Sequence, residues 1–231
     1  MDFIKNQDLG FGKENIFTFV INGDMESHIE TIKKELENHP GIVRVAVANQ
    51  KIWQLENTTG DTDWEGKDPK ESMMIKPVNV DNDFKDVLGL DLVEGRWFSE
   101  GRNDSLSFIL NETAVAATGL TDPVGKSFSL WDEKGTIIGV VKDFHHASIH
   151  QKIEPVILFH WPHWYWLVYV KVDGHDPPGA IKLLKKCEAF NPEYPFQYSL
   201  SMLRMTRWNA SDKRTGKNIW RAFSLLGIAH L

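Results

Sequence analysis

The alternation of apolar and polar positions predicts a β–α–β unit near the start of the chain. Two runs rich in β-branched and aromatic residues, Ile16 to Ile21 and Ile42 to Ala48, have the character of buried strands. Between these runs, apolar residues recur at helical spacing and predict one buried helix face, formed by Ile29, Ile32 and Leu36. This first unit spans residues 14–49.

A similar pattern near the end of the chain predicts a second β–α–β unit. Its strands are expected at 155–159, 165–172 and 196–202, with a helix over 179–190. Two strands from each unit and the two helices can form one open sheet with both helices on one face, which is a split β–α–β arrangement. We therefore predict an α+β fold in which residues 14–50 and 155–203 together build one lobe.

Residues 51–154 follow a different pattern and predict a second α+β lobe, inserted between the two units. Residues 50–72 are mostly polar, with two tryptophans embedded, and predict a long loop. This loop would be either a surface excursion anchored by the tryptophans or a binding loop. The run 73–80 has strand character but contains Pro77, which lacks a backbone donor. We therefore expect an edge strand there.

The stretch Ser107 to Pro155 predicts a strand, a short helix, a turn and a hairpin in succession. Asn111 follows a short apolar run and can cap the helix, because its side-chain oxygen can accept an early backbone N–H. Gly119 suits the left-handed exit of that helix. Two β-rich runs then predict a hairpin around residues 132–135.

Composition and charge narrow the classes of function. With 231 residues, 42% of them hydrophobic and 25% charged, the chain can form one large globular domain or two small ones. The net charge of −6 argues against a nucleic-acid partner, because such binders present clustered positive charge. The single cysteine, Cys187, excludes an internal disulfide and a cysteine-based zinc cluster.

The sequence contains no motif with correct catalytic spacing. Residues Gly119 to Ser127 imitate a phosphate-binding loop, but its two glycines stand one residue too far apart. The strongest candidates for metal ligands are His145, His146 and His150, of which the last two could share a helical face. We nevertheless expect no catalytic residue, no cofactor and no bound metal.

The chain has nine tryptophans, which is many for its length. Large aromatic side chains usually belong to cores or interfaces, so most of them are expected to serve packing. Four of them are candidates for an interaction surface: Trp53, Trp64, Trp161 and Trp164.

Five phrases of the sequence resemble a known family. They are DFIKNQDLGFGKENIF, FILNETAVAATGL, DPVGKSF, IIGVVKDFHHASIHQKIEP and KRTGKNIWRAFSLLGIA. On these phrases the chain resembles the extracytoplasmic core domain of FtsX-like, MacB-type ABC transporter permeases. The resemblance covers most of the chain and implies a membrane-proximal sheet lobe that carries an inserted distal lobe, residues 51–154.

This resemblance implies a non-catalytic domain at the periplasmic, or extracytoplasmic, face of the cytoplasmic membrane. Residues 1–13 and 204–231 would be juxtamembrane segments that lead to membrane helices of a parent protein. A cytoplasmic ATPase subunit or domain would hydrolyse ATP. The domain would couple movement of the flanking helices to the handling of a substrate or partner. Further partners would be a second permease copy or a periplasmic protein.

Two other classes of function stay open on the residues alone. A soluble ligand-binding or sensor domain could use the segment 160–166, rich in tryptophan and histidine, as the rim of a pocket. A metal-dependent hydrolase could use the three histidines at 145, 146 and 150.

Overall fold

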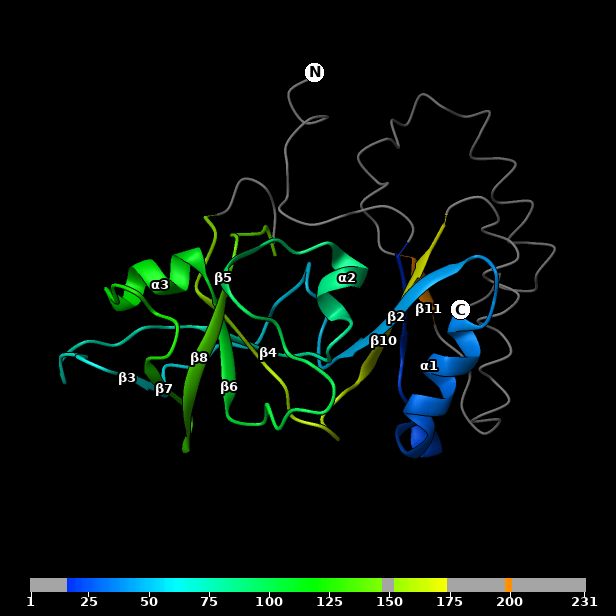
Figure 1. Ribbon diagram of the computed structural model, residues 1–231, viewed down its shortest axis with the longest axis horizontal. Coiled ribbons are helices and arrows are strands. Elements are labelled where there is room, and N and C mark those ends of the chain that lie inside the picture. Colours follow the sequence, from blue (N-terminus) through cyan, green and yellow to red (C-terminus); the bar gives the residue numbers. More distant parts are fainter. Residues whose placement is uncertain (1–15, 147–151, 174–197, 201–231) are drawn as a thin grey trace, which may run out of the picture.

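Two β-sheets lie next to each other along the long axis of the molecule (Figure 1). The computed structural model describes residues 16–146, 152–173 and 198–200. The chain starts in a four-stranded sheet, builds a seven-stranded sheet and then returns to the first. This mixture of helices and strands confirms the predicted α+β fold class.

The four-stranded sheet has the strand order β11-β1-β10-β2. Its strands are β1 (Ile16–Val20), β2 (Ile42–Ala48), β10 (Leu167–Val172) and β11 (Tyr198–Leu200). Strands from the two ends of the chain alternate in it, and neighbouring strands run antiparallel. This is the single open sheet that the two β–α–β patterns predict. The helix expected over 179–190 lies outside the described residues.

Helices cover both faces of the four-stranded sheet. They are η1 (Gly23–His28), α1 (Ile29–Glu37) and α2 (Phe84–Leu88). On one face, Ile32 of α1 belongs to an apolar cluster with Phe19 of β1. On the other face, the Phe84 ring of α2 meets the Tyr169 ring of β10 edge-on, with centroids 5.1 Å apart. Because α2 comes from the inserted segment, that segment closes the second face of the sheet.

The seven-stranded sheet has the order β3-β7-β8-β6-β9-β4, with β5 paired to β8. The helix α3 (Glu112–Thr118) follows β6 directly. The strands are β3 (Thr62–Trp64), β4 (Lys76–Asn79), β5 (Leu92–Gly95), β6 (Ser107–Asn111), β7 (Ser127–Leu130), β8 (Glu133–Val141) and β9 (Val156–Phe159).

The strand β9 corrects the predicted grouping of strands. The sequence pattern assigned residues 155–159 to the β–α–β lobe, but β9 lies inside the seven-stranded sheet. It runs parallel to β4 and antiparallel to β6. All four residues of β9 are buried, so the strand suits the centre of a covered sheet. The chain therefore crosses between the sheets after Phe159.

Two further strands lie in the region before β5. Residues 62–64, which were expected to be part of a surface loop, form β3 and pair with β7. The prediction for β4 is confirmed: it contains Pro77 and lies at the edge of its sheet. A proline at an edge removes no ladder hydrogen bond from the interior of the sheet.

The β7–β8 hairpin is tighter than predicted. Leu130 pairs with Glu133, so the turn consists of two residues, Trp131 and Asp132. Gly135, which was expected in the turn, lies within β8, where a Cβ atom would come 2.1 Å from the carbonyl oxygen of Leu106. Glycine is needed there because the two backbones approach closely.

The predicted cap and exit of the helix in this stretch are both confirmed. Asn111 accepts a hydrogen bond from the backbone N–H of Ala114 at 3.0 Å, as the first turn of α3 requires. Gly119 ends the helix with φ of +65°, in the left-handed region.

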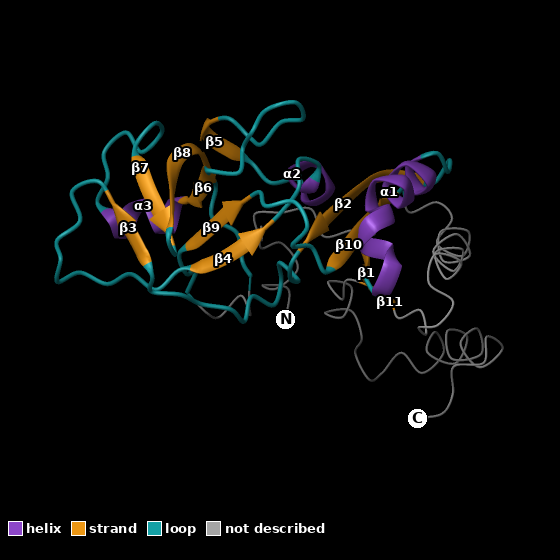
Figure 2. Cartoon of the chain, turned by 90° about the horizontal axis from the view of Figure 1, so that it is seen from below, coloured by secondary structure: helices purple, strands orange, loops and turns teal. Residues whose placement is uncertain are grey.

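One apolar core joins the two sheets. It contains Ala46 and Tyr169 from the four-stranded sheet together with Val78 and Ile109 from the seven-stranded sheet. Figure 2 shows α2 next to β2, between the two groups of strands. None of the helices in the described ranges is long and apolar enough to cross a membrane.

Candidate interaction surface at the junction of the two sheets

The loop 160–166 connects β9 to β10 and is held by the buried side chain of Asn79. The Asn79 Oδ1 accepts a hydrogen bond from the Trp161 N–H at 2.7 Å. The Nδ2 donates to the carbonyl oxygens of Trp161 and Trp164 at 2.9 and 2.8 Å. Asn79 is fully buried, and its amide replaces the strand partners that the backbone loses where it leaves the sheet.

An aromatic cluster is formed by Trp131, Phe159, Trp161 and Trp164. The loop contributes Trp161 and Trp164 to it. Their ring centroids lie 4.7 to 5.9 Å apart. Trp161 also donates its indole N–H to the carbonyl oxygen of Ser105 at 2.8 Å. The three indoles are half-buried, so the cluster covers the core of the seven-stranded sheet and keeps a solvent-facing side.

The structure brings together only two of the four tryptophans predicted as an interaction surface. Trp161 and Trp164 lie 5.9 Å apart by ring centroid. Trp64 is a core residue, 5% exposed, and donates its indole N–H to the carbonyl oxygen of Thr118. Trp53 packs separately, edge-on to Tyr169 of the shared core. An interaction surface therefore stays a prediction for Trp161 and Trp164, and buried Trp64 is not available for one.

Sequence reasoning missed Trp131 and Asn79. Trp131 occupies the hairpin turn with φ of +54°, a region that glycine normally takes. The hairpin was visible in the sequence, but the conformation of its turn was not. Asn79 is the last residue but one of the predicted strand 73–80, next to an acidic stretch, and a polar residue near a strand end gives no sign of which loop it binds.

A buried ion pair ties α1 to the connection between β4 and α2. Lys33 Nζ lies 2.5 Å from Asp81 Oδ2 and 2.9 Å from Asp83 Oδ2. Burial raises the pKa of Asp81 to about 6, although Lys33 opposes that effect. Burial alone would lower the pKa of Lys33, but the two carboxylates outweigh it and raise that pKa. Breaking this pair would leave a charge buried without compensation.

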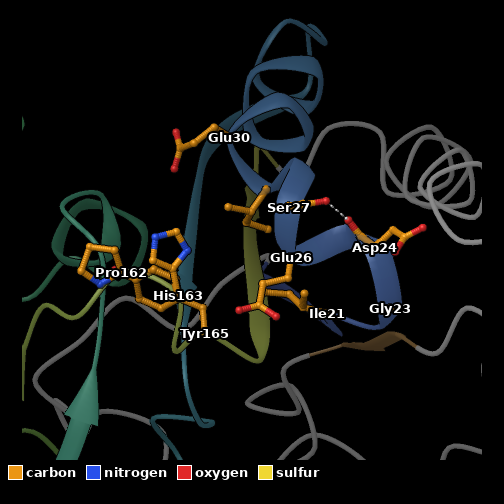
Figure 3. Close-up of a pocket in the computed structure, with 10 residues that line it drawn as sticks. Ile21, Gly23, Asp24, Glu26, Ser27, Glu30, Pro162, His163 and Tyr165 are labelled. Carbon is orange, nitrogen blue, oxygen red and sulfur yellow. Dashed lines mark hydrogen bonds between the residues drawn. The ribbon is translucent and has the colours of Figure 1, made fainter.

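A groove of about 670 Å³ opens between the loop 160–166 and the segment that leads into α1 (Figure 3). Its half-buried residues are Ile21, Ile29 and Tyr165. Exposed residues form the rest of its wall: Gly23, Asp24, Glu26, Ser27, Glu30, Pro162 and His163. The segment 160–166 thus contributes a histidine and a tyrosine to a pocket rim, but its tryptophans lie elsewhere.

The predicted histidine ligands lie in different surroundings. His146 is buried, and its Nε2 accepts a hydrogen bond from the Glu154 N–H at 3.4 Å. Burial lowers the pKa of His146. Asp143 is occupied by three hydrogen bonds at the start of α3, and His145 is half-buried. His150 lies outside the described residues. Within the described ranges, no group of three or more acidic, histidine or cysteine side chains is arranged to hold a metal ion.

The first and last described strands are neighbours. β1 and β11 pair antiparallel, with Phe17 opposite Leu200 and Phe19 opposite Tyr198. The start of β1 and the end of β11 therefore lie at the same end of the sheet. At that end the chain enters β1 and leaves β11.

A comparison with protein families decides which group this fold represents. The sequence model of the family described as MacB-like periplasmic core domain matches residues 4–185. The chain belongs to this family. The match covers both sheets apart from β11. It also covers the groove and the loop that Asn79 holds.

Solved structures show the same fold for the MacB-like domain. The periplasmic region of MacB from Actinobacillus actinomycetemcomitans has a TM-score of 0.58 and 18% identity, covering 85% of this chain and 94% of that one. A domain of a putative permease protein from Porphyromonas gingivalis has a TM-score of 0.56 and 18% identity, covering 82% and 91%. The extracellular domain of the noncanonic ABC-type transporter YknZ from Gram-positive bacteria has a TM-score of 0.56 and 16% identity, covering 80% and 98%. No curated protein matches the chain.

Family membership makes this chain a periplasmic domain of a MacB-like ABC transporter permease. Such domains stand on the extracytoplasmic face of the cytoplasmic membrane and serve transport. The permeases work with an ATPase, and the domain family is in general not enzymatic. The predicted family, location and transport role are thereby confirmed.

Proposed function

We propose that this domain transmits movement between the membrane helices of its permease and a substrate or partner in the periplasm, without catalysis of its own. The observation that carries the proposal is the pairing of β1 with β11. A sheet whose first and last strands are neighbours receives both flanking segments at one end. Displacement of those segments then acts on two hydrogen-bonded strands together.

The sheet can pass such a displacement to the inserted segment because the two share a core. The apolar cluster around Tyr169 includes side chains of both sheets. The ion pair between Lys33 and Asp81 and the Asn79 contacts to the loop 160–166 add polar links across the junction. Packed cores deform little and transmit strain. We therefore expect the two sheets to move as one body.

The proposal assigns parts of the chain as follows. Residues 14–50 and 155–203 form a membrane-proximal lobe, apart from β9, which pairs in the other sheet. Residues 51–154 form the inserted distal lobe. Residues 1–13 and 204–231 lead to the flanking membrane helices of the permease. The movement originates in the ATPase that works with the permease, and a second permease copy or a periplasmic protein receives it.

Distance measurements in the intact permease test this role. Nitroxide labels would be placed on exposed Glu133, in the β7–β8 hairpin, and on a membrane helix that adjoins the domain, in a Cys187→Ser background. Pulsed electron paramagnetic resonance should show that this distance changes between the nucleotide-free and ATP-bound states. A second label pair, on Val43 and Glu133, reports from within the domain and should keep its distance. The proposal is wrong if the helix-to-hairpin distance stays constant while ATP is hydrolysed.

A further inference from the structure

The groove beside the loop 160–166 has a chemical character that mechanical transmission does not use. Its volume of about 670 Å³ lies within the usual range of protein binding sites. It is formed where η1 and the start of α1 face that loop, so it is bounded by elements of the sheet lobe and by the connection between the two sheets. Ile21, Ile29 and Tyr165 supply an apolar and aromatic floor.

Two carboxylates, which have no hydrogen-bond or ion-pair partner among the described residues, face this floor. Glu26 and Glu30 project from η1 and α1 toward the loop, whereas the side chain of Asp24 points away from it (Figure 3). Within the described part of the chain, neither Glu26 nor Glu30 makes a hydrogen bond or an ion pair. Among the described residues that line the groove there is no lysine or arginine. The groove therefore presents negative charge that no basic side chain among its described lining residues balances, and a positively charged group bound there would do so.

We propose that this groove docks a basic segment of a partner protein. A lysine or arginine side chain would place its charged end between Glu26 and Glu30. Its aliphatic stem, or an adjacent apolar residue, would cover Ile29 and the Tyr165 ring. Both features of the groove are then used, because a basic peptide segment supplies positive charge and apolar surface together. The assignment rests on this charge complementarity and not on the proposed transmission of movement.

A peptide-binding experiment with the 231-residue chain tests the proposal. The probe is a short fluorescein-labelled peptide in which arginine alternates with leucine, and binding is followed by fluorescence anisotropy. The double variant Glu26→Gln/Glu30→Gln should weaken binding about tenfold, which corresponds to about 1.4 kcal/mol. The matched control, Glu71→Gln/Glu100→Gln, changes the net charge equally at exposed carboxylates outside the groove and should bind like the wild type.

Three results would overturn the proposal. The first is the absence of binding of the arginine–leucine peptide up to millimolar concentration. The second is equal binding of a peptide in which glutamate replaces arginine, or equal weakening by the groove and control variants. The third is competition by free arginine amide at the same concentration as the peptide, which would assign the groove to a small cation instead. Thermal melting of both double variants checks that each is folded.

Discussion

The side chain of Asn79 holds the backbone of Trp161 from both sides. Its Oδ1 accepts from the Trp161 N–H at 2.7 Å, and its Nδ2 donates to the Trp161 carbonyl oxygen at 2.9 Å. One buried amide at the end of β4 therefore fixes the loop that joins the two sheets. Removing it would leave buried backbone groups without partners, and each such group costs about 1–3 kcal/mol.

The first prediction concerns this contact. Asn79→Ala should lower the free energy of unfolding by about 3 kcal/mol, because it removes three hydrogen bonds of a buried side chain. Urea denaturation measures the change. The control Asn57→Ala alters an exposed asparagine and should stay within about 0.5 kcal/mol of the wild type. Equal stability of the two variants would contradict the role given to Asn79.

The second prediction concerns the backbone of the hairpin turn. Trp131 adopts a φ of +54°, which costs a residue with a Cβ atom about 1–2 kcal/mol and costs glycine little. Trp131→Ala and Trp131→Gly both lose the aromatic contacts, but the glycine variant should be more stable than the alanine variant by about 0.5–1 kcal/mol. Chemical denaturation of the pair decides the point. An alanine variant as stable as the glycine variant would show that the turn carries no strain.

The third prediction concerns Gly135 in β8. A methyl group there would meet the Leu106 carbonyl oxygen, so Gly135→Ala should destabilise the fold by about 3 kcal/mol. The control is Gly41→Ala, where the nearest atom lies 3.9 Å from the added Cβ and φ is not positive. This variant should stay within about 0.5 kcal/mol of the wild type in thermal or urea unfolding. A mild effect at Gly135 would mean that β6 and β8 can separate locally.

The fourth prediction concerns pH and Asp104. Burial alone would raise the pKa of Asp104, but hydrogen bonds from Arg96, Ser99 and Ser107 hold it below its ordinary value. A lowered folded-state pKa contributes stability above the unfolded-state pKa, and that contribution is lost as pH falls through the folded-state pKa.

Asp104→Asn should therefore be clearly less stable than the wild type at neutral pH. The difference should shrink below about pH 4, where the carboxyl group of the unfolded chain becomes protonated. Urea midpoints measured across this range test the prediction. A stability difference that is the same at both ends of the range would exclude ionisation of Asp104 as its source.

The fifth prediction concerns the buried ion pair. Lys33→Met should cost about 3–5 kcal/mol, because Asp81 would remain buried without its partner. The double variant Lys33→Met/Asp81→Leu removes both charges and should recover much of the loss. Denaturation of Lys33→Met, Asp81→Leu and the double variant completes the cycle. Additive losses would show that the two side chains do not interact energetically.

Local patterns predicted the individual elements well because the information for them lies within a few residues. The apolar spacing on α1 and the strand character of β1 and β2 are both visible in the sequence, and both elements formed. The cap at Asn111 and the left-handed exit at Gly119 depend on backbone geometry within one helix. Pro77 indicated an edge strand because proline has no backbone N–H to donate to a neighbouring strand.

The candidate site was much less predictable. Trp161 and Trp164 are close in sequence, and their rings are in contact in the structure. Trp64 is buried in the core because residues 62–64 pair with β7. The partners that complete the aromatic cluster come from the β7–β8 turn and the end of β9. The groove combines the start of α1 with the loop 160–166, more than a hundred residues further along the chain.

The sequence alone determined the α+β class, the two β–α–β patterns and the family, because spacing and short phrases carry that information. Only the tertiary structure decided that β9 leaves its expected partners and pairs with β4 and β6. A strand of four buried apolar residues fits the interior of either sheet, so its own sequence does not choose between them. The choice depends on which strand edges the rest of the chain presents, and those edges exist only once distant segments have packed together.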